Sequence, residues 1–175
     1  MTTPPPMVRP TPQFMFARLS HLIALGLGSG LSPRAPGTVG TLWAWAAFLL
    51  IQTGAQPSDL TWALLIACTG LVGWWASRAT VQRCGVAYPG YIVIDEIVAF
   101  WAVLWLTTPA GFWQQAAAFG LFRFFDAAKP GPVAWADRAF KGTGWRGAWG
   151  IMFDDLVAAF CTLLVLALLR SFGLL

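Results

Sequence analysis

The sequence predicts an all-α fold: a polytopic membrane helical bundle with about five membrane-embedded helices plus an N-terminal interfacial helix. Hydrophobic residues make up 58% of the 175-residue chain before its 18 glycines are counted. Soluble domains reach only about 45–50% with glycine included. The mean hydropathy is +0.66, and charged residues account for only 10% of the sequence. We therefore expect one membrane-embedded domain over residues 14–175.

The charge of the chain indicates which partners it binds, and its cysteines indicate whether disulfides or zinc sites are expected. The net charge is +4, and the basic residues are dispersed and adjoin apolar segments. This pattern favours anionic lipid headgroups as partners and argues against nucleic acid. The three cysteines show no CxxC spacing, and we interpret them as small buried hydrophobic residues: Cys68, Cys84 and Cys161. Neither a disulfide framework nor a zinc site is expected.

The N-terminal region divides into two parts. Residues 1–13 are rich in Pro and Thr and are predicted to be disordered. Residues 14–30 are not a signal peptide, because their apolar core at residues 22–27 is short and no A-x-A cleavage site follows. We expect an amphipathic or partly inserted helix at the membrane face that ends at the glycines Gly26, Gly28 and Gly30.

A Gly/Pro loop, GSGLSPRAPGT at residues 28–38, leads into the next apolar run. Thr38 is predicted to cap the helix that follows, which leaves the N–H groups of its first turn facing the loop. Such a helix start favours an anion such as phosphate, and Arg34 would add positive charge. The loop lacks the GK[ST] ending of a P-loop, and an ordinary loop-to-helix junction is the alternative.

Two uncharged runs, residues 35–58 and residues 60–77, are long enough to cross the membrane. The connection between them contains no Lys or Arg, whereas Arg78 and Arg83 follow the second run. The positive-inside rule therefore predicts that the N-terminus and the loop after the second span face the cytoplasm.

Residues 97–122 are also uncharged and allow two topologies. A single span would separate Asp95 and Glu96 from the acidic residues that follow it. The sequence TTPAG at residues 107–111 instead favours two helices that form a hairpin. We prefer the hairpin, because it brings the six clustered carboxylates to one side. Ten of the eleven Lys and Arg residues then face the cytoplasm, and only Arg170 lies outside. A last span is predicted at residues 156–169.

Six of the seven acidic residues belong to two short stretches: Asp95 and Glu96, then Asp126, Asp137, Asp154 and Asp155. An ionised side chain at membrane depth costs about 2.5–3.5 kcal/mol, so these carboxylates need compensation. Oxygen ligands without His or paired Cys suit Mg²⁺ or Mn²⁺. We therefore expect a metal site at the heads of two spans, formed by Asp95, Glu96, Asp154 and Asp155. Each acid could instead be a helix cap or half of an ion pair.

Asp137 is interpreted differently. Lys141 follows it at i+4, so the two residues are expected to form a pair on the surface of a helix. Its substitution should matter less than that of the other acids.

Arg123, Asp126 and Lys129 recur every three residues and would share one face of a helix. They could form a ladder of salt bridges. A site that holds two cations beside a divalent metal would also fit a phosphate group, because both stabilise the charge on its oxygens.

Four motifs together resemble the phosphatidylglycerophosphatase A family: GSGLSPRAPGTVGTL, YIVIDE, FRFFDAAKPGPV with the following Asp137, and GIMFDDLVAA. They occur in the family's order from residue 28 to about residue 159. The resemblance implies an all-helical fold and Mg²⁺-dependent removal of the terminal phosphate of phosphatidylglycerophosphate. The product would be phosphatidylglycerol, made by a multi-pass protein of the bacterial inner membrane whose active site faces the cytoplasm.

The resemblance also implies roles for individual residues. Asp95, Glu96, Asp154 and Asp155 would hold Mg²⁺, and Asp126 would share the metal or orient the attacking water. The phosphate would be bound by Arg34, Arg123 and Lys129 with the backbone of Gly37 and Thr38. Asp126 and Lys129 are the predicted catalytic residues. A water activated on the metal needs no covalent intermediate, and which carboxylate is the general base stays open.

Other chemistries fit less well. No Cys is followed six positions later by Arg, the only His is His21, and no DxDxT sequence is present. These absences exclude the cysteine, histidine and haloacid-dehalogenase classes of phosphatase. The DG…AR signature of CDP-alcohol phosphotransferases is also missing. A small transporter or ion-binding protein that uses the same carboxylates is the alternative, but it would spread its acids through the membrane depth and preferably contain a repeat.

Overall fold

The computed structural model describes residues 10–84, 89–140 and 145–175 of the chain, and all regular structure in these ranges is helical. The predicted all-α class is confirmed. In chain order the elements are α1 (Pro12–Phe16), α2 (Leu19–Ala24), the 3-10 helix η1 (Gly26–Leu31), α3 (Pro36–Ala55), α4 (Asp59–Cys84), α5 (Ile94–Thr107), α6 (Phe112–Ala128), α7 (Pro132–Ala139) and α8 (Trp145–Ser171).

Three of the described helices are long and apolar enough to cross a membrane: Pro36–Ala55, Asp59–Cys84 and Gly147–Ser171. The two spans predicted before residue 84 are thus confirmed as α3 and α4. Helices α5 and α6 contain 14 and 17 residues, fewer than the 20 or so that cross a bilayer without help. The total of about five membrane-embedded helices therefore stays a prediction. Three described helices have the length and composition needed to span a membrane.

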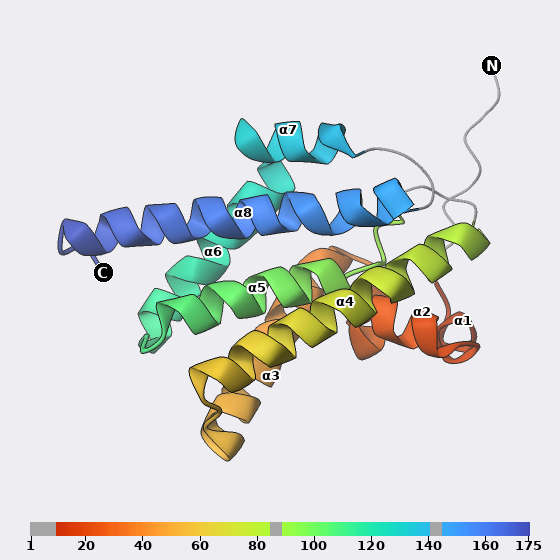
Figure 1. Ribbon diagram of the computed structural model, residues 1–175, viewed down its shortest axis with the longest axis horizontal. Helices are drawn as coiled ribbons and strands as arrows, with labels where there is room; N and C mark the ends of the chain where they lie inside the picture. Colours follow the sequence, from red (N-terminus) through yellow and green to blue (C-terminus); the bar gives the residue numbers. More distant parts are fainter. Residues whose placement is uncertain (1–9, 85–88, 141–144) are drawn as a thin grey trace.

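Helix α5 is the centre of the bundle. It contacts α3, α4, α6 and α8, and ten of its 14 residues are buried. Figure 1 shows α5 lying between α4 and α8, with the first turn of α5 toward the end where α1, α2 and the start of α8 lie. The other end holds the α3–α4 turn, the α5–α6 turn and the C-terminus. Residues at the start of α5 are therefore held on several sides.

The hairpin formed by α5 and α6 is confirmed. Helix α5 ends at Thr107 and α6 begins at Phe112. The turn contains Pro109, which has no N–H with which to continue a helix. An ion pair between Glu96 of α5 and Arg123 of α6 joins the far ends of the two helices. The topology with a single span over residues 97–122 is thereby excluded.

The N-terminal segment is divided rather than one continuous helix. Arg18 has extended backbone between α1 and α2, and Gly26 and Gly28 have positive φ of 53° and 110°. A Cβ at Gly26 would lie 2.6 Å from Ile97 Cδ1, so only glycine fits this turn against α5. The predicted disorder of residues 1–13 falls mainly on residues outside the described part, but Pro12 and Gln13 already belong to α1.

Tryptophan N–H groups connect the helices inside the bundle. Trp101 Nε1 of α5 donates to the Ala44 carbonyl oxygen at 2.8 Å, and Trp45 Nε1 of α3 donates to Gln115 Oε1 of α6 at 2.6 Å. Such bonds help to hold helices together where lipid removes the hydrophobic drive for association.

The prediction that all three cysteines are buried is wrong. Cys68 is exposed on α4, whereas Cys84 and Cys161 are partly buried, and all three are free thiols. A lipid-facing position accepts the same apolar residues as a protein core, so hydrophobicity alone did not distinguish the two.

Candidate active site

Five carboxylates from three helices gather in one cluster. Asp95 and Glu96 lie in the first turn of α5, Asp126 lies near the end of α6, and Asp154 and Asp155 lie on α8. Asp155 is within electrostatic range of the other four. Asp95, Asp154 and Asp155 are only 7%, 5% and 3% exposed. The hairpin and α8 thus bring together acids that are up to 60 positions apart in the sequence.

Asp154 and Asp155 do not lie at the head of the last span, as the sequence had suggested. Helix α8 begins at Trp145, nine residues before Asp154, which corresponds to about 13 Å of helix. No proline or charge interrupts residues 147–153, so the helix continues upstream of the acids. Both carboxylates therefore lie in the interior of α8.

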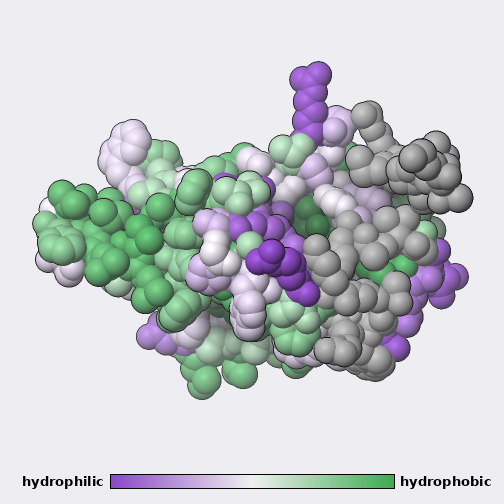
Figure 2. Space-filling view, turned by 90° about the horizontal axis from the view of Figure 1, so that it is seen from above, coloured by the Kyte–Doolittle hydropathy of each residue, from purple (hydrophilic) through white to green (hydrophobic). Residues whose placement is uncertain are grey.

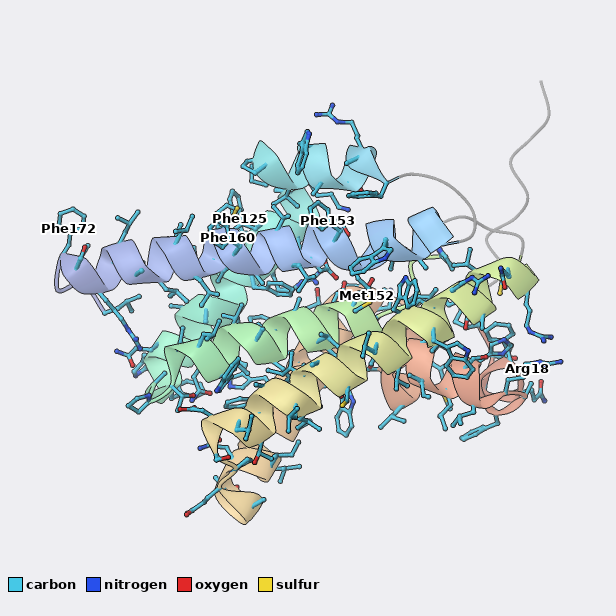
Figure 3. All side chains as sticks on the ribbon, in the orientation of Figure 1. Arg18, Phe125, Met152, Phe153, Phe160 and Phe172 are labelled. Atoms are coloured by element: carbon cyan, nitrogen blue, oxygen red, sulfur yellow. The ribbon has the colours of Figure 1, made fainter. Side chains whose placement is uncertain are left out.

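Packing on both sides of α8 sets its rotation at this level. Phe153 packs against Trp135 of α7, with ring centroids 6.1 Å apart. A Cβ at Gly70 of α4 would lie 3.9 Å from Met152 Cε. Figure 3 shows Met152 on the side of α8 nearer α4 and Phe153 on the α7 side. The two aspartates that follow are thereby aimed at the bundle interior.

Arg123 connects three helices through one nitrogen. Its Nη1 donates to Asp126 Oδ2 at 2.6 Å, to Glu96 Oε1 at 3.2 Å and to Thr41 Oγ1 at 3.3 Å. Thr41 is fully buried, and its hydroxyl donates to the Gly37 carbonyl oxygen at 2.9 Å. The guanidinium therefore fixes the start of α3 relative to both arms of the α5–α6 hairpin.

Two glycines on one face of α3 make room for the Glu96 carboxylate. A Cβ at Gly37 would lie 2.0 Å from Glu96 Oε1. A Cβ at Gly40 would lie 3.2 Å from Glu96 Oε2 and 2.8 Å from Val93 Cβ. Any side chain at Gly37 would displace the carboxylate or separate α3 from α5. The GTVG sequence thus has a steric role beside the anion-binding role predicted for it.

The prediction that Thr38 caps α3 is wrong. The helix begins at Pro36, and its N-cap residue is Ala35, which has φ of 46° and makes no side-chain cap. Proline suits the first helical position because its φ is already helical and it has no N–H to satisfy. The donors of the first turn that lack an acceptor within the helix are therefore the N–H groups of Gly37 and Thr38.

Lys129 is the second cation of the site. It ends α6 with a left-handed φ of 45°, a conformation that glycine or asparagine usually provides. Its Nζ donates to Asp137 Oδ1 of α7 at 2.6 Å and to Asp154 Oδ2 of α8. Burial lowers the pKa of Lys129, but the bonds and charges of these two carboxylates outweigh it, and the pKa rises above its ordinary value. Lys129 is therefore protonated at neutral pH.

Two carboxylate oxygens in the cluster have no hydrogen-bond partner among the described residues. They are Glu96 Oε2 and Asp154 Oδ1, and both are fully buried. A buried polar atom left unpaired costs about 1–3 kcal/mol. Within residues 10–84, 89–140 and 145–175, however, no three acidic, His or Cys side chains converge as ligands of one ion. The four predicted metal ligands lie in one cluster but do not form a coordination shell.

Arg34 makes no ion pair with the acids of this cluster. It is exposed on the loop before α3, and its side chain forms no ion pair with a described residue. Figure 2 shows hydrophilic residues gathered over the middle of this face, whereas the end formed by the last turns of α8 is hydrophobic. Exposed Leu164 and Leu168 on α8, and Phe172 directly after it, contribute apolar surface there.

Sequence reasoning missed the pair formed by Lys129 and Asp137, and the role of Thr41. The two charged residues are eight positions apart and lie on either side of a turn, so no helical spacing relates them. The predicted partner of Asp137, Lys141, lies outside the described residues, and that pair stays a prediction. Thr41 carried a detectable signal, because it follows Gly37 by one helical turn on the same face.

Fold and site together define a membrane-embedded helical protein in which buried carboxylates surround one arginine and one lysine. The sequence model of the family described as phosphatidylglycerophosphatase A matches residues 22–170. The chain therefore belongs to the phosphatidylglycerophosphatase A family and is a phosphatase, a hydrolase of phosphoric monoesters.

Curated relatives cover most of the chain. It is 39% identical over 142 residues to phosphatidylglycerophosphatase A of Escherichia coli, covering 79% of this chain and 76% of that protein. It is 37% identical over 148 residues to the protein of the same name from Haemophilus influenzae, covering 83% and 85%. A Bacteroides thetaiotaomicron protein named as a candidate phosphatidylinositol-3-phosphatase is 34% identical over 157 residues, covering 87% and 94%. No solved structure matches the chain.

The first prediction concerns the contact between Gly37 and Glu96. Gly37→Ala should lower turnover roughly a hundredfold, the loss typical of a displacement of about 1 Å in a catalytic site. Gly54→Ala in the same helix is the control, because an added Cβ there meets no atom within 4 Å. It should leave turnover unchanged and stabilise α3 slightly. Phosphate release by the two purified variants checks this, and equal turnover would remove the steric role of Gly37.

The second prediction concerns Asp137, whose carboxylate holds Lys129. Asp137→Asn should lower kcat/KM roughly tenfold, which corresponds to about 1.4 kcal/mol of transition-state stabilisation. Arg138→Gln is the matched control, since it also removes one charge from α7 but at an exposed position. If both variants retain full kcat/KM, Asp137 has only the surface role that the sequence predicted.

Proposed function

We propose that the chain removes the terminal phosphate of phosphatidylglycerophosphate to give phosphatidylglycerol, a step of phospholipid synthesis. The printed names of the Escherichia coli and Haemophilus influenzae relatives support this substrate. The observation that carries the proposal is the pairing of both site cations with carboxylates. Arg123 lies between Glu96 and Asp126, and Lys129 lies between Asp137 and Asp154.

The two cations would bind the phosphate oxygens. Arg123 and Lys129 are charged donors, and such groups stabilise the charge that develops on a phosphoryl group in the transition state. The N–H groups of Gly37 and Thr38 at the start of α3 would add two neutral donors. Arg34 is close to them in sequence and would reach the phosphate from the loop. Asp126 shares Arg123 with Glu96 and would orient the attacking water.

Charge balance supports a bound metal ion. Five carboxylates face two cations, even before Asp137 is counted. A phosphate dianion would add negative charge to a site that already has an excess of it. Mg²⁺ suits an all-oxygen donor set, and the unpartnered Glu96 Oε2 and Asp154 Oδ1 are oxygens that a cation would satisfy. Asp95, Glu96, Asp154 and Asp155 would hold the ion, which activates water and neutralises phosphate charge when bound.

In the proposed reaction the water oxygen forms a bond to phosphorus while the ester P–O bond to the glycerol headgroup breaks. The headgroup oxygen leaves in line and takes up a proton, and inorganic phosphate is released. No side chain becomes covalently attached. Lys129 stabilises the phosphate oxygens throughout, because its pairing with two carboxylates keeps it protonated.

The proposed location is the bacterial inner membrane with the site on the cytoplasmic side. Helices long enough to span support a membrane protein. Arg78 and Arg83 near the end of α4, and the basic residues between α6 and α8, support the orientation. A transporter that uses the same acids is disfavoured, because the carboxylates gather in one cluster. The Bacteroides thetaiotaomicron relative favours testing a second class of substrate, the phosphoinositides.

The third prediction concerns the metal. Purified protein in detergent micelles should release phosphate from phosphatidylglycerophosphate with Mg²⁺, lose release in EDTA, and regain it when Mg²⁺ is restored. Phosphatidylinositol 3-phosphate and phosphatidic acid in parallel micelles measure selectivity. Undiminished release in EDTA would overturn the metal proposal but not the phosphatase assignment.

The fourth prediction concerns the carboxylates. Asp95→Asn, Glu96→Gln and Asp155→Asn should each lower kcat by roughly a hundredfold or more, since each is proposed to contact the metal. Asp59→Asn is the matched control, because Asp59 lies outside the cluster and its Oδ1 accepts a hydrogen bond from Trp105 Nε1. Size-exclusion profiles and circular dichroism show whether each variant is folded. Near-normal kcat in a folded cluster variant would exclude that residue from the site.

A further inference from the structure

We propose that an apolar groove between α3, α4 and α5 binds one acyl chain of the lipid substrate. The inference rests on the proposed lipid phosphatase activity and assigns the part of the substrate that the charged cluster does not contact. The groove has a volume of about 370 Å³, and no charged residue lines it. The lining residues with polar side-chain atoms are Thr69, Cys68, Trp43 and Trp101.

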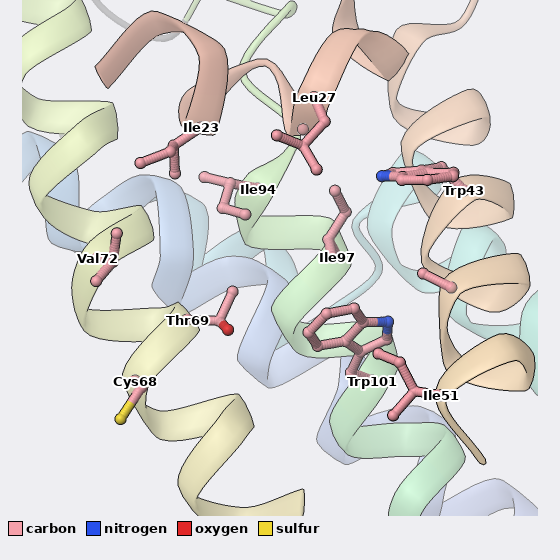
Figure 4. Close-up of a pocket in the computed structure, with 12 residues that line it drawn as sticks. Ile23, Leu27, Trp43, Ile51, Cys68, Thr69, Val72, Ile94, Ile97 and Trp101 are labelled. Atoms are coloured by element: carbon pink, nitrogen blue, oxygen red, sulfur yellow. The ribbon is translucent and has the colours of Figure 1, made fainter. Parts of the chain in front are cut away.

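The α5 wall of the groove and two carboxylates of the charged site belong to the same helix. Ile94 and Ile97 line the groove and flank Asp95 and Glu96 on the same turn of helix. Trp101 follows one turn further along. Figure 4 shows these three side chains lying between α3 and α4. The carboxylates and the apolar wall are thus held by one rigid element.

Along α3, residues that contact the charged site are likewise followed by residues that line the groove. Gly37 and Gly40 lie against Glu96, and Trp43 and Ala47 line the groove further along the helix. Gly40 and Ala47 are about 10 Å apart at 1.5 Å per residue. In this proposal the phosphate lies at the charged cluster and the chain extends along α3 and α5 to the groove.

The groove is open toward the lipid. Two of its walls, α3 and α4, are helices that can span the membrane. Side chains at its margin are exposed: Trp43 is 39%, Val72 46% and Leu27 62% accessible. Lipid hydrocarbon surrounds such residues in a bilayer. An acyl chain can thus enter sideways while the phosphate stays at the charged end, whereas an ionic ligand would find no countercharge in the groove.

The test compares a substrate with long acyl chains and a substrate with short ones. Thr69→Trp fills the groove from α4, and Leu71→Trp is the matched control, because Leu71 is exposed on the same helix and does not line the groove. KM and kcat are measured with dioleoyl and dihexanoyl phosphatidylglycerophosphate at fixed detergent. We expect Thr69→Trp to raise KM about tenfold for the dioleoyl lipid, as exclusion of roughly two methylene groups would. KM for the dihexanoyl lipid should stay within about twofold.

The outcomes separate the two proposals. Equal effects of Thr69→Trp and Leu71→Trp on both lipids would overturn the groove and leave the phosphatase intact. A loss of turnover on both lipids by Thr69→Trp alone would also overturn it, since chain length would then not matter. No release from either lipid by the unmodified chain would overturn the proposed function itself.

A second measurement does not depend on a large substitution. In a variant with Cys84→Ser and Cys161→Ala, Cys68 is the remaining thiol, and it is exposed at the groove. Dioleoyl phosphatidylglycerophosphate should slow its alkylation by a maleimide several-fold relative to lipid-free detergent, whereas soluble glycerol phosphate should not. An alkylation rate unaffected by the dioleoyl lipid would contradict binding in the groove. If a second copy of the chain covered Cys68 instead, the alkylation rate would depend on protein concentration. That result would also contradict binding of the acyl chain in the groove.

Discussion

Arg123 Nη1 lies within hydrogen-bonding distance of Thr41 on α3, Glu96 on α5 and Asp126 on α6. A partly buried guanidinium is more stable when its donors and its charge are both compensated. Here the carboxylates supply the charge and the threonine hydroxyl links the cation to the backbone of Gly37. Because every partner comes from a different turn or helix, the positions of α3, α5 and α6 depend on one another through this group.

Lys129 links helices through ion pairs, as Arg123 does. It joins the end of α6 to α7 and α8 through Asp137 and Asp154. Each cation thus pairs with two acids, and both cations are placed by α6. These internal ion pairs hold the site together. A phosphate that binds the same cations must exchange partners with carboxylates, which links substrate binding to the charge state of the whole cluster.

Much of the arrangement followed from local sequence. The hairpin was predictable because TTPAG interrupts an uncharged run, and the acids lay in motifs that the fold brings together. Features that depend on tertiary contacts were not predictable. Thr38 was taken for a cap because threonine often is one, whereas Pro36 begins the helix two residues earlier. Lys129 meets Asp137 only because its backbone turns into the left-handed region after α6. The metal coordination and the role of Arg34 remain predictions.

The N-terminal segment supports the first turn of α5 from outside the cluster. Val93 N donates to the Ala24 carbonyl oxygen at 3.0 Å, and a Cβ at Gly30 would lie 2.2 Å from the Tyr91 carbonyl oxygen. These contacts hold the backbone just ahead of Asp95. A shortened protein that starts after residue 30 would keep every charged residue of the cluster and still lose the support of that turn. An affinity tag is therefore better placed ahead of residue 10 than substituted for the first helices.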